Sequence, residues 1–521
     1  MSWTRREVLS AASLLAAGCT RAPPSSVSIP GEYLEPDHRR GHLLREGSVA
    51  AAGEPRVLRT GVVIVGGGVA GLSAAWALKR AGFEDFCLLE LENEVGGTAR
   101  GAHTAGLLHP LGAHYVPQPS EESRAVRALF EELGIITGHA GGVPVYDETM
   151  LCQAPEHRLF QEGRWIDGNF PRIGMQDRDR AELERLQAEL SALREARDGQ
   201  GRRAFAIPMA YSSPDPRWRS WDQRTMAAWL DQLGVRSPRV RWWVEYGLRD
   251  DYGTTLETTS AWAGLHYFCS RGLADPDVLT WPEGNGWLVE RLRGKVAPCL
   301  SAGYLVHRIR PGVVEALGPE GPVRFVCDRV IVALPHYVAA RVVEGLERVP
   351  ELSYAPWLVA NVHVEEPPPG AAWDNVFYDS SSLGYVVSTH QSLSVRPGPS
   401  VLTWFRPYTG ADPVAARKAL LEASREALLQ EVLGDLERAH RGLRRMVTRV
   451  DLTRWGHGMV RPTPGLLFGA GKNALSDAEG PICYAHSDLS GLALFEEAQY
   501  RGVLAAERTL RALGQPYTSL L

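Results

Sequence analysis

The sequence has little that would predict a nucleic-acid partner, a metal centre or a membrane-spanning protein. Its 521 residues have a net charge of only −5 at pH 7, so no nucleic acid or strongly charged partner is expected. The seven cysteines show no metal-ligand spacing, and we predict no metal site. Because Cys87, Cys327 and Cys483 lie in apolar, strand-like runs, buried thiols are expected rather than a disulfide framework. No apolar run is long enough to span a membrane as a helix.

The N-terminal residues resemble an export signal. Residues 4–9 (TRREVL) resemble a twin-arginine motif, and a short apolar stretch follows them. Residues 15–19 (LAAGC) resemble a lipoprotein cleavage box with Cys19 as the lipidated residue, whereas a plain signal peptide cut nearby is the alternative. We expect residues 1–19 to direct export to the periplasm or cell envelope, with the membrane reached through the lipid. Residues 20–56 are rich in Pro, Ser, Gly and charge and are expected to form a tether.

One stretch near the N-terminus has the pattern of a dinucleotide-binding unit. The apolar run 62–65 predicts a buried parallel strand, and a predicted helix follows it. Between them, Gly66, Gly68 and Gly71 allow a tight turn, a close approach to a pyrophosphate and close packing of helix on strand. The next apolar run ends in Glu90, which can accept hydrogen bonds from ribose hydroxyls. Together these elements predict a bound dinucleotide rather than a plain glycine-rich turn.

The residues that follow resemble a more specific signature. Residues 93–97 (NEVGG) place a Gly-Gly pair shortly after the acid, which resembles the FAD site of the flavin-containing amine oxidase and phytoene desaturase superfamily. Thr98 stands where that family often has Arg, so Arg100 is the candidate for a phosphate contact. A second, C-terminal motif contains Asp488, although Glu497 replaces a usual Gly there. The resemblance implies non-covalent FAD, contacted by Gly66, Gly68, Val69, Ala70, Gly71, Glu90, Gly96, Gly97, Thr98, Arg100, Gly112, Ala113, His114, Tyr115, Val306, Asp488 and Ala498.

The same resemblance implies the architecture. It is an α/β fold in which a FAD-binding, Rossmann-like (doubly wound) domain carries an inserted α+β substrate-binding domain. Val323–Cys327 and Asp328–Pro335 are predicted as two successive strands of the FAD-binding domain. The FAD-binding domain is expected over residues 57–118, 285–345 and 460–515, and the substrate domain over residues 119–284 and 346–459.

The aromatic stretch 240–272 is the first candidate for the substrate side. Such a stretch can line an apolar cavity. Asp250 and Asp251, beside Tyr252, could bind a cationic substrate there. The alternative is that these acids cap a helix or pair with Arg249.

The remaining candidates rest on the resemblance. Trp455, His457 and His114 are candidate catalytic residues, with simple core packing as the alternative for each. Trp455 is also a candidate for substrate contact, as is Leu494, which stands where the amine oxidases have an aromatic cage residue. Those enzymes keep a lysine near the flavin, but the corresponding predicted strand, 356–364, has no lysine.

Three functions remain open. The first is FAD-dependent oxidation of an amine, including a polyamine, by hydride transfer to flavin N5. The second is desaturation or dehydrogenation of an apolar, isoprenoid-like substrate, which the missing lysine and the membrane anchor favour. The third is a lipoprotein that binds FAD without catalysis. For an enzyme we expect a small-molecule substrate and an electron acceptor, either oxygen or a redox partner.

Overall fold

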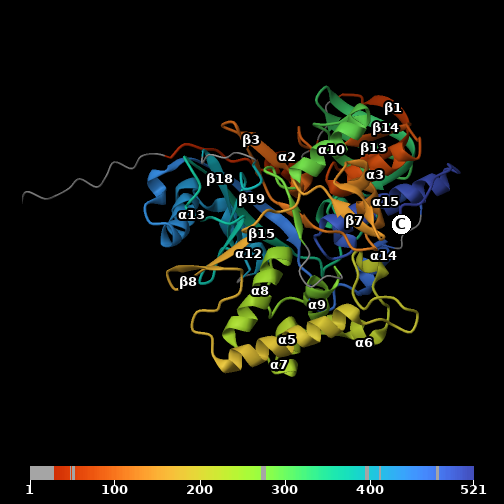
Figure 1. Cartoon of the computed structure of the whole chain (residues 1–521). Helices are drawn as coiled ribbons and strands as arrows, with labels where there is room; N and C mark the ends of the chain where they lie inside the picture. Colours follow the sequence, from red (N-terminus) through yellow and green to blue (C-terminus); the bar gives the residue numbers. More distant parts are fainter. Residues whose placement is uncertain are drawn as a thin grey trace, which may run out of the picture.

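The computed structural model describes residues 29–46, 49, 53–271, 277–392, 398–409, 412–476 and 480–521. The expected signal over residues 1–19, with Cys19, lies outside the described residues. Figure 1 shows a Rossmann-like sheet with its helices at the upper right, a second sheet at the centre, and a layer of helices below. Within the described ranges, no helix combines the length and the apolar character needed to cross a membrane.

The first sheet is built around β1 (Arg56–Val65), whose second half is apolar and buried. The strand order is β11-β2-β1-β14-β13-β12, and β20 pairs with β14. β1 lies parallel to both β2 (Phe86–Leu89) and β14 (Gly321–Val332). Since side chains alternate along a strand, Val62 and Ile64 pack with α3 (Val69–Arg80) and α15 (Phe495–Ala512), whereas Val63 and Val65 pack with β12 and β13.

β14 is one continuous strand, which corrects the prediction of two strands over 323–327 and 328–335. It pairs with β1 from Arg56↔Val323 to Val65↔Val332. On its other edge the first part pairs with β13 and the last part with β20. Because the pairing with β1 continues across the predicted break, the backbone stays extended through Asp328.

The second sheet has the order β19-β15-β18-β17-β16-β8-β9. Strand β15 (Tyr354–Val364), which lies between β19 and β18, is buried along its whole length. Helices α12 (Pro413–Glu422) and α13 (Arg425–Ala439) belong to this part, and α13 contributes to the apolar core on one face of the sheet. The other strands are β19 (Val447–Val460), β18 (Ser400–Pro407), β17 (Gly384–Val387), β16 (Asp374–Phe377), β8 (His157–Gln161) and β9 (Arg164–Asp167).

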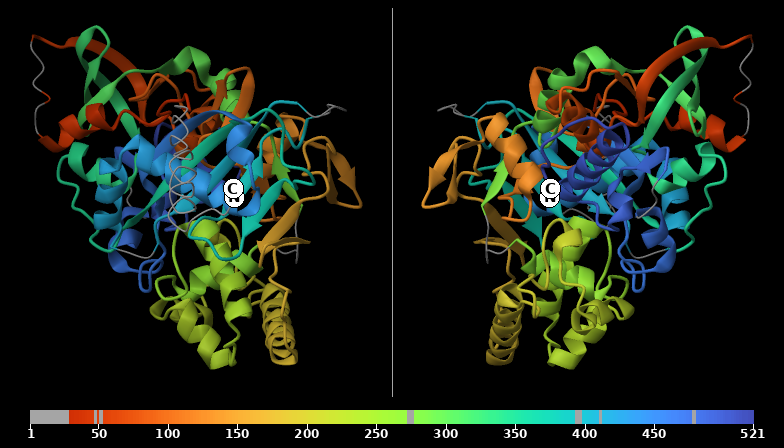
Figure 2. Two further views of the ribbon diagram at one scale, coloured as in Figure 1. Left: turned by 90° about the vertical axis from the view of Figure 1, so that its left-hand side faces the viewer. Right: turned by 90° about the vertical axis from the view of Figure 1, so that its right-hand side faces the viewer.

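A layer of helices closes the lower side of the second sheet, and Figure 2 shows it (yellow to light green) below the sheets from both directions. Pro238 occupies the first turn of α8 (Pro238–Tyr252), Ser237 caps it, and Gly253 ends it in a left-handed conformation. The core of this layer includes the fully buried Trp262. The other helices are α5 (Asp177–Glu195), α6 (Pro216–Arg219), α7 (Met226–Leu233) and α9 (Ala261–Cys269).

Part of the segment that we expected to be a tether packs on the folded chain. Residues 29–46 include α2 (His38–Glu46). The Val450 N–H of β19 donates to the Pro30 carbonyl at 2.9 Å, and the Arg40 guanidinium donates to the Leu91 carbonyl at 3.1 Å. Composition could not predict these contacts. One is a backbone contact with the distant strand β19, and the other is made by the long side chain of Arg40.

The remaining elements connect these parts. Among the described residues, no cysteine forms a disulfide. The remaining helices are α4 (Arg124–Glu132), α10 (Gly286–Val296), α11 (His336–Val342) and α14 (Ala470–Ser476), and the remaining strands are β3 (Gly101–Thr104), β4 (Leu107–Pro110), β5 (Tyr115–Pro117), β6 (Ile136–Ala140), β7 (Val143–Tyr146), β10 (Val278–Thr280), β11 (Leu300–Ser301), β12 (Leu305–Arg310), β13 (Val313–Gly318) and β20 (Ile482–Tyr484).

Candidate functional site

Two glycine-rich loops lie side by side at the end of β1 and form a cradle. A Cβ atom on Gly71 would lie 1.8 Å from the Gly66 carbonyl oxygen, so the helix and the turn can approach only because this residue is glycine. In the second loop the Gly96 N–H donates to the Gly67 carbonyl at 2.8 Å. A Cβ on Gly68 would meet nothing within 4 Å. No side chain caps the N-terminus of α3, so its N–H groups face this open space, which suits a pyrophosphate.

Glu90 closes one end of the cradle. Its carboxylate accepts hydrogen bonds from the Gly67 N–H at 2.7 Å and the Glu92 N–H at 2.9 Å. Burial raises the pKa of Glu90 above its usual value. The backbone N–H of Tyr304 donates to the Glu90 carbonyl at 2.7 Å, and Val306 follows on β12, where the pairing with β13 is irregular. Glu90 and Val306, two of the predicted FAD contacts, therefore lie on neighbouring segments of the chain.

Arg100 and the turn at Gly112 form the other end. The Arg100 Nε is buried and has no hydrogen-bond partner among the described residues. Its guanidinium lies 5.7 Å from the Trp455 ring. The Ala113 N–H donates to the Thr98 carbonyl at 3.0 Å, and a Cβ on Gly112 would lie 2.3 Å from that same oxygen. A buried guanidinium nitrogen without a partner, next to an open glycine cradle, fits a phosphate group.

The C-terminal motif fits less directly. The Asp488 carboxylate is buried and accepts hydrogen bonds from the His336 N–H at 2.8 Å and the Tyr354 hydroxyl at 2.6 Å. Burial opposes ionisation, but these bonds and nearby His486 together hold the pKa of Asp488 below its usual range. Asp488 thus joins the start of α11 to β15. Ala498 lies in the first turn of α15, which reaches α3 so closely that a Cβ on Gly502 would lie 2.1 Å from the Ala70 carbonyl.

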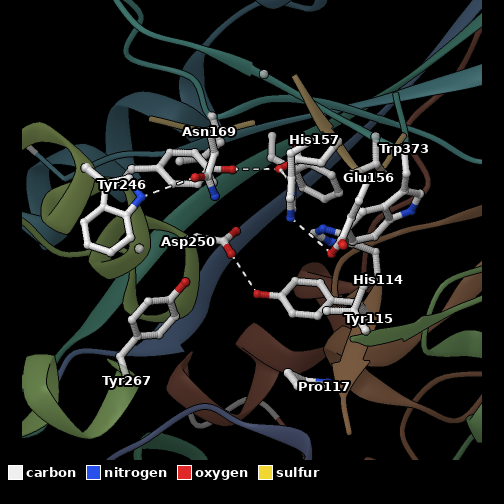
Figure 3. Close-up of a pocket in the computed structure, with 18 of the residues that line it drawn as sticks. His114, Tyr115, Pro117, Glu156, His157, Asn169, Tyr246, Asp250, Tyr267 and Trp373 are labelled. Carbon is white, nitrogen blue, oxygen red and sulfur yellow. Dashed lines mark hydrogen bonds and ion pairs between the residues drawn. The ribbon is translucent and has the colours of Figure 1, made fainter. Parts of the chain in front are cut away.

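A cavity of about 200 Å³ opens next to the turn that contains His114 and Tyr115. Its aromatic wall includes His114, which stacks on Phe405 with ring centroids 4.4 Å apart. Tyr115 and Asp250 point toward each other across it (Figure 3). The lining comes from β5, α8, α9, β8 and the strands β16–β18 and includes His114, Tyr115, Pro117, Glu156, His157, Asn169, Trp243, Tyr246, Asp250, Tyr267, Arg271, Trp373, Asp374 and Phe405.

Asp250 is the first acidic group of the cavity. The Tyr115 hydroxyl donates to Asp250 Oδ2 at 2.9 Å. Burial, followed by the charges of Asp251 and Asp374, raises the pKa of Asp250 to about 7. Asp251 lies 3.8 Å from the Arg271 guanidinium. Arg249 does not pair with either acid, because its guanidinium donates to the carbonyls of Ser380, Ser381 and Ser382.

A second acidic group faces the first. Asp374 Oδ2 accepts a hydrogen bond from the Tyr246 hydroxyl at 3.0 Å and lies 3.2 Å from His157 Nδ1. The other His157 nitrogen lies 3.1 Å from the Glu156 carboxylate. Burial alone would lower the pKa of His157, but Asp374 and Glu156 outweigh it and raise the pKa to about 10. With Asp250, the cavity lining therefore has three carboxyl groups and three basic side chains, His157, Arg194 and Arg271. Asp251, behind the lining, lies beside Arg271.

Five of the predicted substrate or catalytic residues, Asp251, Tyr252, Trp455, His457 and Leu494, do not line this cavity. The Trp455 indole N–H donates to the Leu111 carbonyl at 2.7 Å and so supports the Gly112 turn. His457 stacks on Tyr337 with centroids 4.0 Å apart, and burial lowers its pKa to about 3. Tyr252 and Leu494 belong to the apolar core of the helical layer. Of the residues predicted for the substrate, Asp250 lines the cavity and Asp251 lies behind it.

Several cavity residues were not predicted. On α8, Trp243, Tyr246 and Gly247 recur with the predicted Asp250 every three or four residues, and this spacing could have identified one cavity-facing side of the helix. His157 and Asp374 had no such signal, because they meet only through the parallel pairing of β8 and β16.

Comparisons with known proteins agree with this geometry. Residues 64–133 match the NAD(P)-binding Rossmann-like domain family. The structure of putrescine oxidase bound to putrescine superimposes with a TM-score of 0.64 at 16% identity, covering 87% of this chain and 99% of that chain. Cyclohexylamine oxidase from Brevibacterium oxydans IH-35A gives a TM-score of 0.63 at 15% identity, with 87% and 99% coverage. The chain has the amine oxidase fold.

This likeness confirms the predicted α/β fold class with its Rossmann-like domain, and it agrees with FAD as the predicted non-covalent cofactor. Sequence similarity is confined to a short segment. Over 74 residues the chain is 39% identical to polyamine oxidase 1 of Zea mays, and the match spans 14% of this chain and 14% of that protein. At 15–16% identity, the structural likeness describes the fold and leaves the substrate to the site itself.

Proposed function

We propose that this chain is a FAD-dependent oxidoreductase that oxidises an amine, with a polyamine as the favoured class of substrate. The observation that supports it most is the acidic and aromatic cavity that begins at the Gly112–Tyr115 turn. The amine oxidase fold and the 74-residue similarity to polyamine oxidase 1 of Zea mays point the same way. When bound, FAD would accept the electrons released when a substrate C–H bond is oxidised.

The cradle residues would hold the cofactor. Gly68 and Gly97 leave room for the pyrophosphate, and the N–H groups at the start of α3 face it. Glu90 would accept hydrogen bonds from the ribose. Arg100, whose Nε has no partner among the described residues, would bind phosphate.

The cavity residues would bind and orient the amine. An ammonium group is attracted to Asp250 and a second one to Asp374, while Trp373, Phe405 and His114 exclude water around the carbon chain. An amine must lose a proton before its neighbouring C–H bond is oxidised. Asp250 is placed to accept that proton, because its pKa of about 7 lies near neutral pH.

The other two functions receive less support from the cavity. An isoprenoid-like chain would have to bury its surface against Asp250, Asp374 and Glu156 in a space of about 200 Å³, and an apolar chain offers these carboxyl groups no hydrogen bond in place of water. A protein that binds FAD without catalysis needs no such cavity.

We also propose that the protein is exported by the twin-arginine route and anchored through a lipid on Cys19, in the periplasm or cell envelope. The support is the N-terminal sequence alone. The electron acceptor, oxygen or a redox partner, is proposed as part of the same scheme.

Anaerobic bleaching of the bound flavin tests the function. The protein loaded with FAD is mixed with diamines, monoamines and apolar isoprenoids in the absence of oxygen, and flavin absorbance is followed. We expect amines to bleach the flavin and isoprenoids to leave it oxidised. Bleaching by the isoprenoids alone would instead establish the desaturase.

A further inference from the structure

Away from the cradle and the cavity, three metal-ligating side chains meet in the interior. His109 lies on β4, His363 on β15 and Asp451 on β19. Their exposed fractions are 0%, 2% and 0%. One ligand atom from each lies within 4.8 Å of the others. The three residues are far apart in the sequence, so no local spacing could predict the cluster.

The two imidazoles lack the hydrogen bonds that buried histidines normally have. None of their four ring nitrogens makes a well-aligned hydrogen bond with a described residue. The rings meet edge to face with centroids 5.5 Å apart. His363 Nε2 lies 3.3 Å from Asp451 Oδ2, but this contact does not have hydrogen-bond geometry. A neutral imidazole carries one N–H donor and one acceptor nitrogen, and leaving both unsatisfied in the interior is unfavourable.

The carboxylate is held in place from outside the cluster. Asp451 Oδ1 accepts the Glu32 N–H at 2.9 Å, and Oδ2 accepts the Arg449 Nε–H at 2.7 Å. Carboxylates that bind metal ions are commonly held in place by hydrogen bonds of this kind.

We propose that His109, His363 and Asp451 bind one divalent metal ion of the zinc class. Two imidazoles and one carboxylate are a ligand set that Zn²⁺ accepts, at about 2.0–2.2 Å from each donor atom. One donor atom of each residue lies within 4.8 Å of the others, so a single ion could reach all three after small side-chain movements. Three protein ligands leave one position for a water molecule.

The role of this ion is structural. None of the three ligands lines the substrate cavity. The ion would join the β3–β4 hairpin to β15 and β19, and the backbone of Glu32 lies against the same carboxylate. His109 precedes the Leu111–Tyr115 turn by only a few residues, so the ion would hold the hairpin that leads to the cradle and the cavity.

Metal content and thermal unfolding test the site without reference to activity. The full chain is purified without a polyhistidine tag, treated with a chelator, and titrated with Zn²⁺ while bound metal and Tm are measured. We expect one Zn²⁺ per chain and a higher Tm on zinc addition, since binding to the folded state stabilises it. Failure of the chelated wild-type protein to bind stoichiometric Zn²⁺ would overturn the proposal, as would binding that leaves Tm unchanged.

Three variants locate the ion. His363→Gln and Asp451→Asn are expected to weaken Zn²⁺ binding at least tenfold and to abolish the zinc-dependent rise in Tm. His103→Gln is the matched control, because His103 lies on the same hairpin but is exposed. Wild-type zinc affinity in both cluster variants, or loss of binding in the control, would place the ion elsewhere. If a cluster variant does not fold, the wild-type titration alone decides the result.

Discussion

Replacing Asp250 with asparagine should weaken amine binding and remove its pH dependence. In the wild-type protein the carboxyl group has a pKa of about 7, so it is mostly neutral below that pH and ionised above it. Affinity for an ammonium group should therefore increase between about pH 6 and pH 8. The Asp250→Asn amide keeps the shape and the contact with Tyr115 but cannot ionise.

The magnitude follows from the contact that is lost. A hydrogen bond between charged groups contributes about 1.5–3 kcal/mol, which corresponds to roughly a 10- to 150-fold increase in Kd at ~1.4 kcal/mol for each factor of ten. Asp374 remains in the variant and still attracts a second ammonium group. Diamines should thus retain weak binding, whereas monoamines should lose most of theirs.

Rapid mixing without oxygen measures both effects. The rate of flavin reduction is recorded against amine concentration at several pH values, which gives Kd and the limiting rate. Asp167→Asn, an exposed acid on β9, is the control. A Kd for Asp250→Asn within twofold of the wild-type value at every pH would refute the role given to this carboxylate.

Four further predictions follow from the same structure. Gly68→Ala should leave the Tm of the protein without FAD unchanged but lower FAD affinity by at least ~tenfold, measured by equilibrium dialysis, because its Cβ enters the open space of the cradle. Gly71→Ala should lower that Tm directly, since the new Cβ would lie 1.8 Å from a carbonyl oxygen. Asp488→Ala should lower the free energy of unfolding in denaturant titrations by about 3 kcal/mol, because two buried donors lose their acceptor. Asp250→Asn should raise the free energy of unfolding by about 2 kcal/mol at pH 8 and by less at pH 5, because the raised pKa means that the ionised carboxylate destabilises the folded state.

The cradle could be predicted from the sequence because its parts are local. A strand, three spaced glycines and an acid at the end of the next strand fix one turn and its neighbours. The structure brings Gly67, Glu90 and Gly96 together by short backbone contacts. Arg100 was also placed from its position just after the second glycine pair.

The cavity could be predicted only in part. Asp250 was identified because it interrupts an aromatic stretch. Its counterpart Asp374 lies on β16 and the neighbouring His157 on β8. These strands are far apart in the sequence and meet only in the folded sheet, so no periodicity within one segment predicts the contact. Trp455 and Leu494 were assigned by position in a family pattern, yet packing places them against Leu111 and in the helical core.

In the proposed function, an amine bound between Asp250 and Asp374 reduces the flavin held in the cradle. The most direct measurement compares anaerobic flavin reduction by a linear diamine and by the monoamine of equal chain length. We expect both amines to reduce the flavin. The diamine should do so at lower concentrations, because the carboxyl groups of Asp250 and Asp374 both face the cavity. A fully loaded flavoprotein that neither amine reduces would contradict the proposed function.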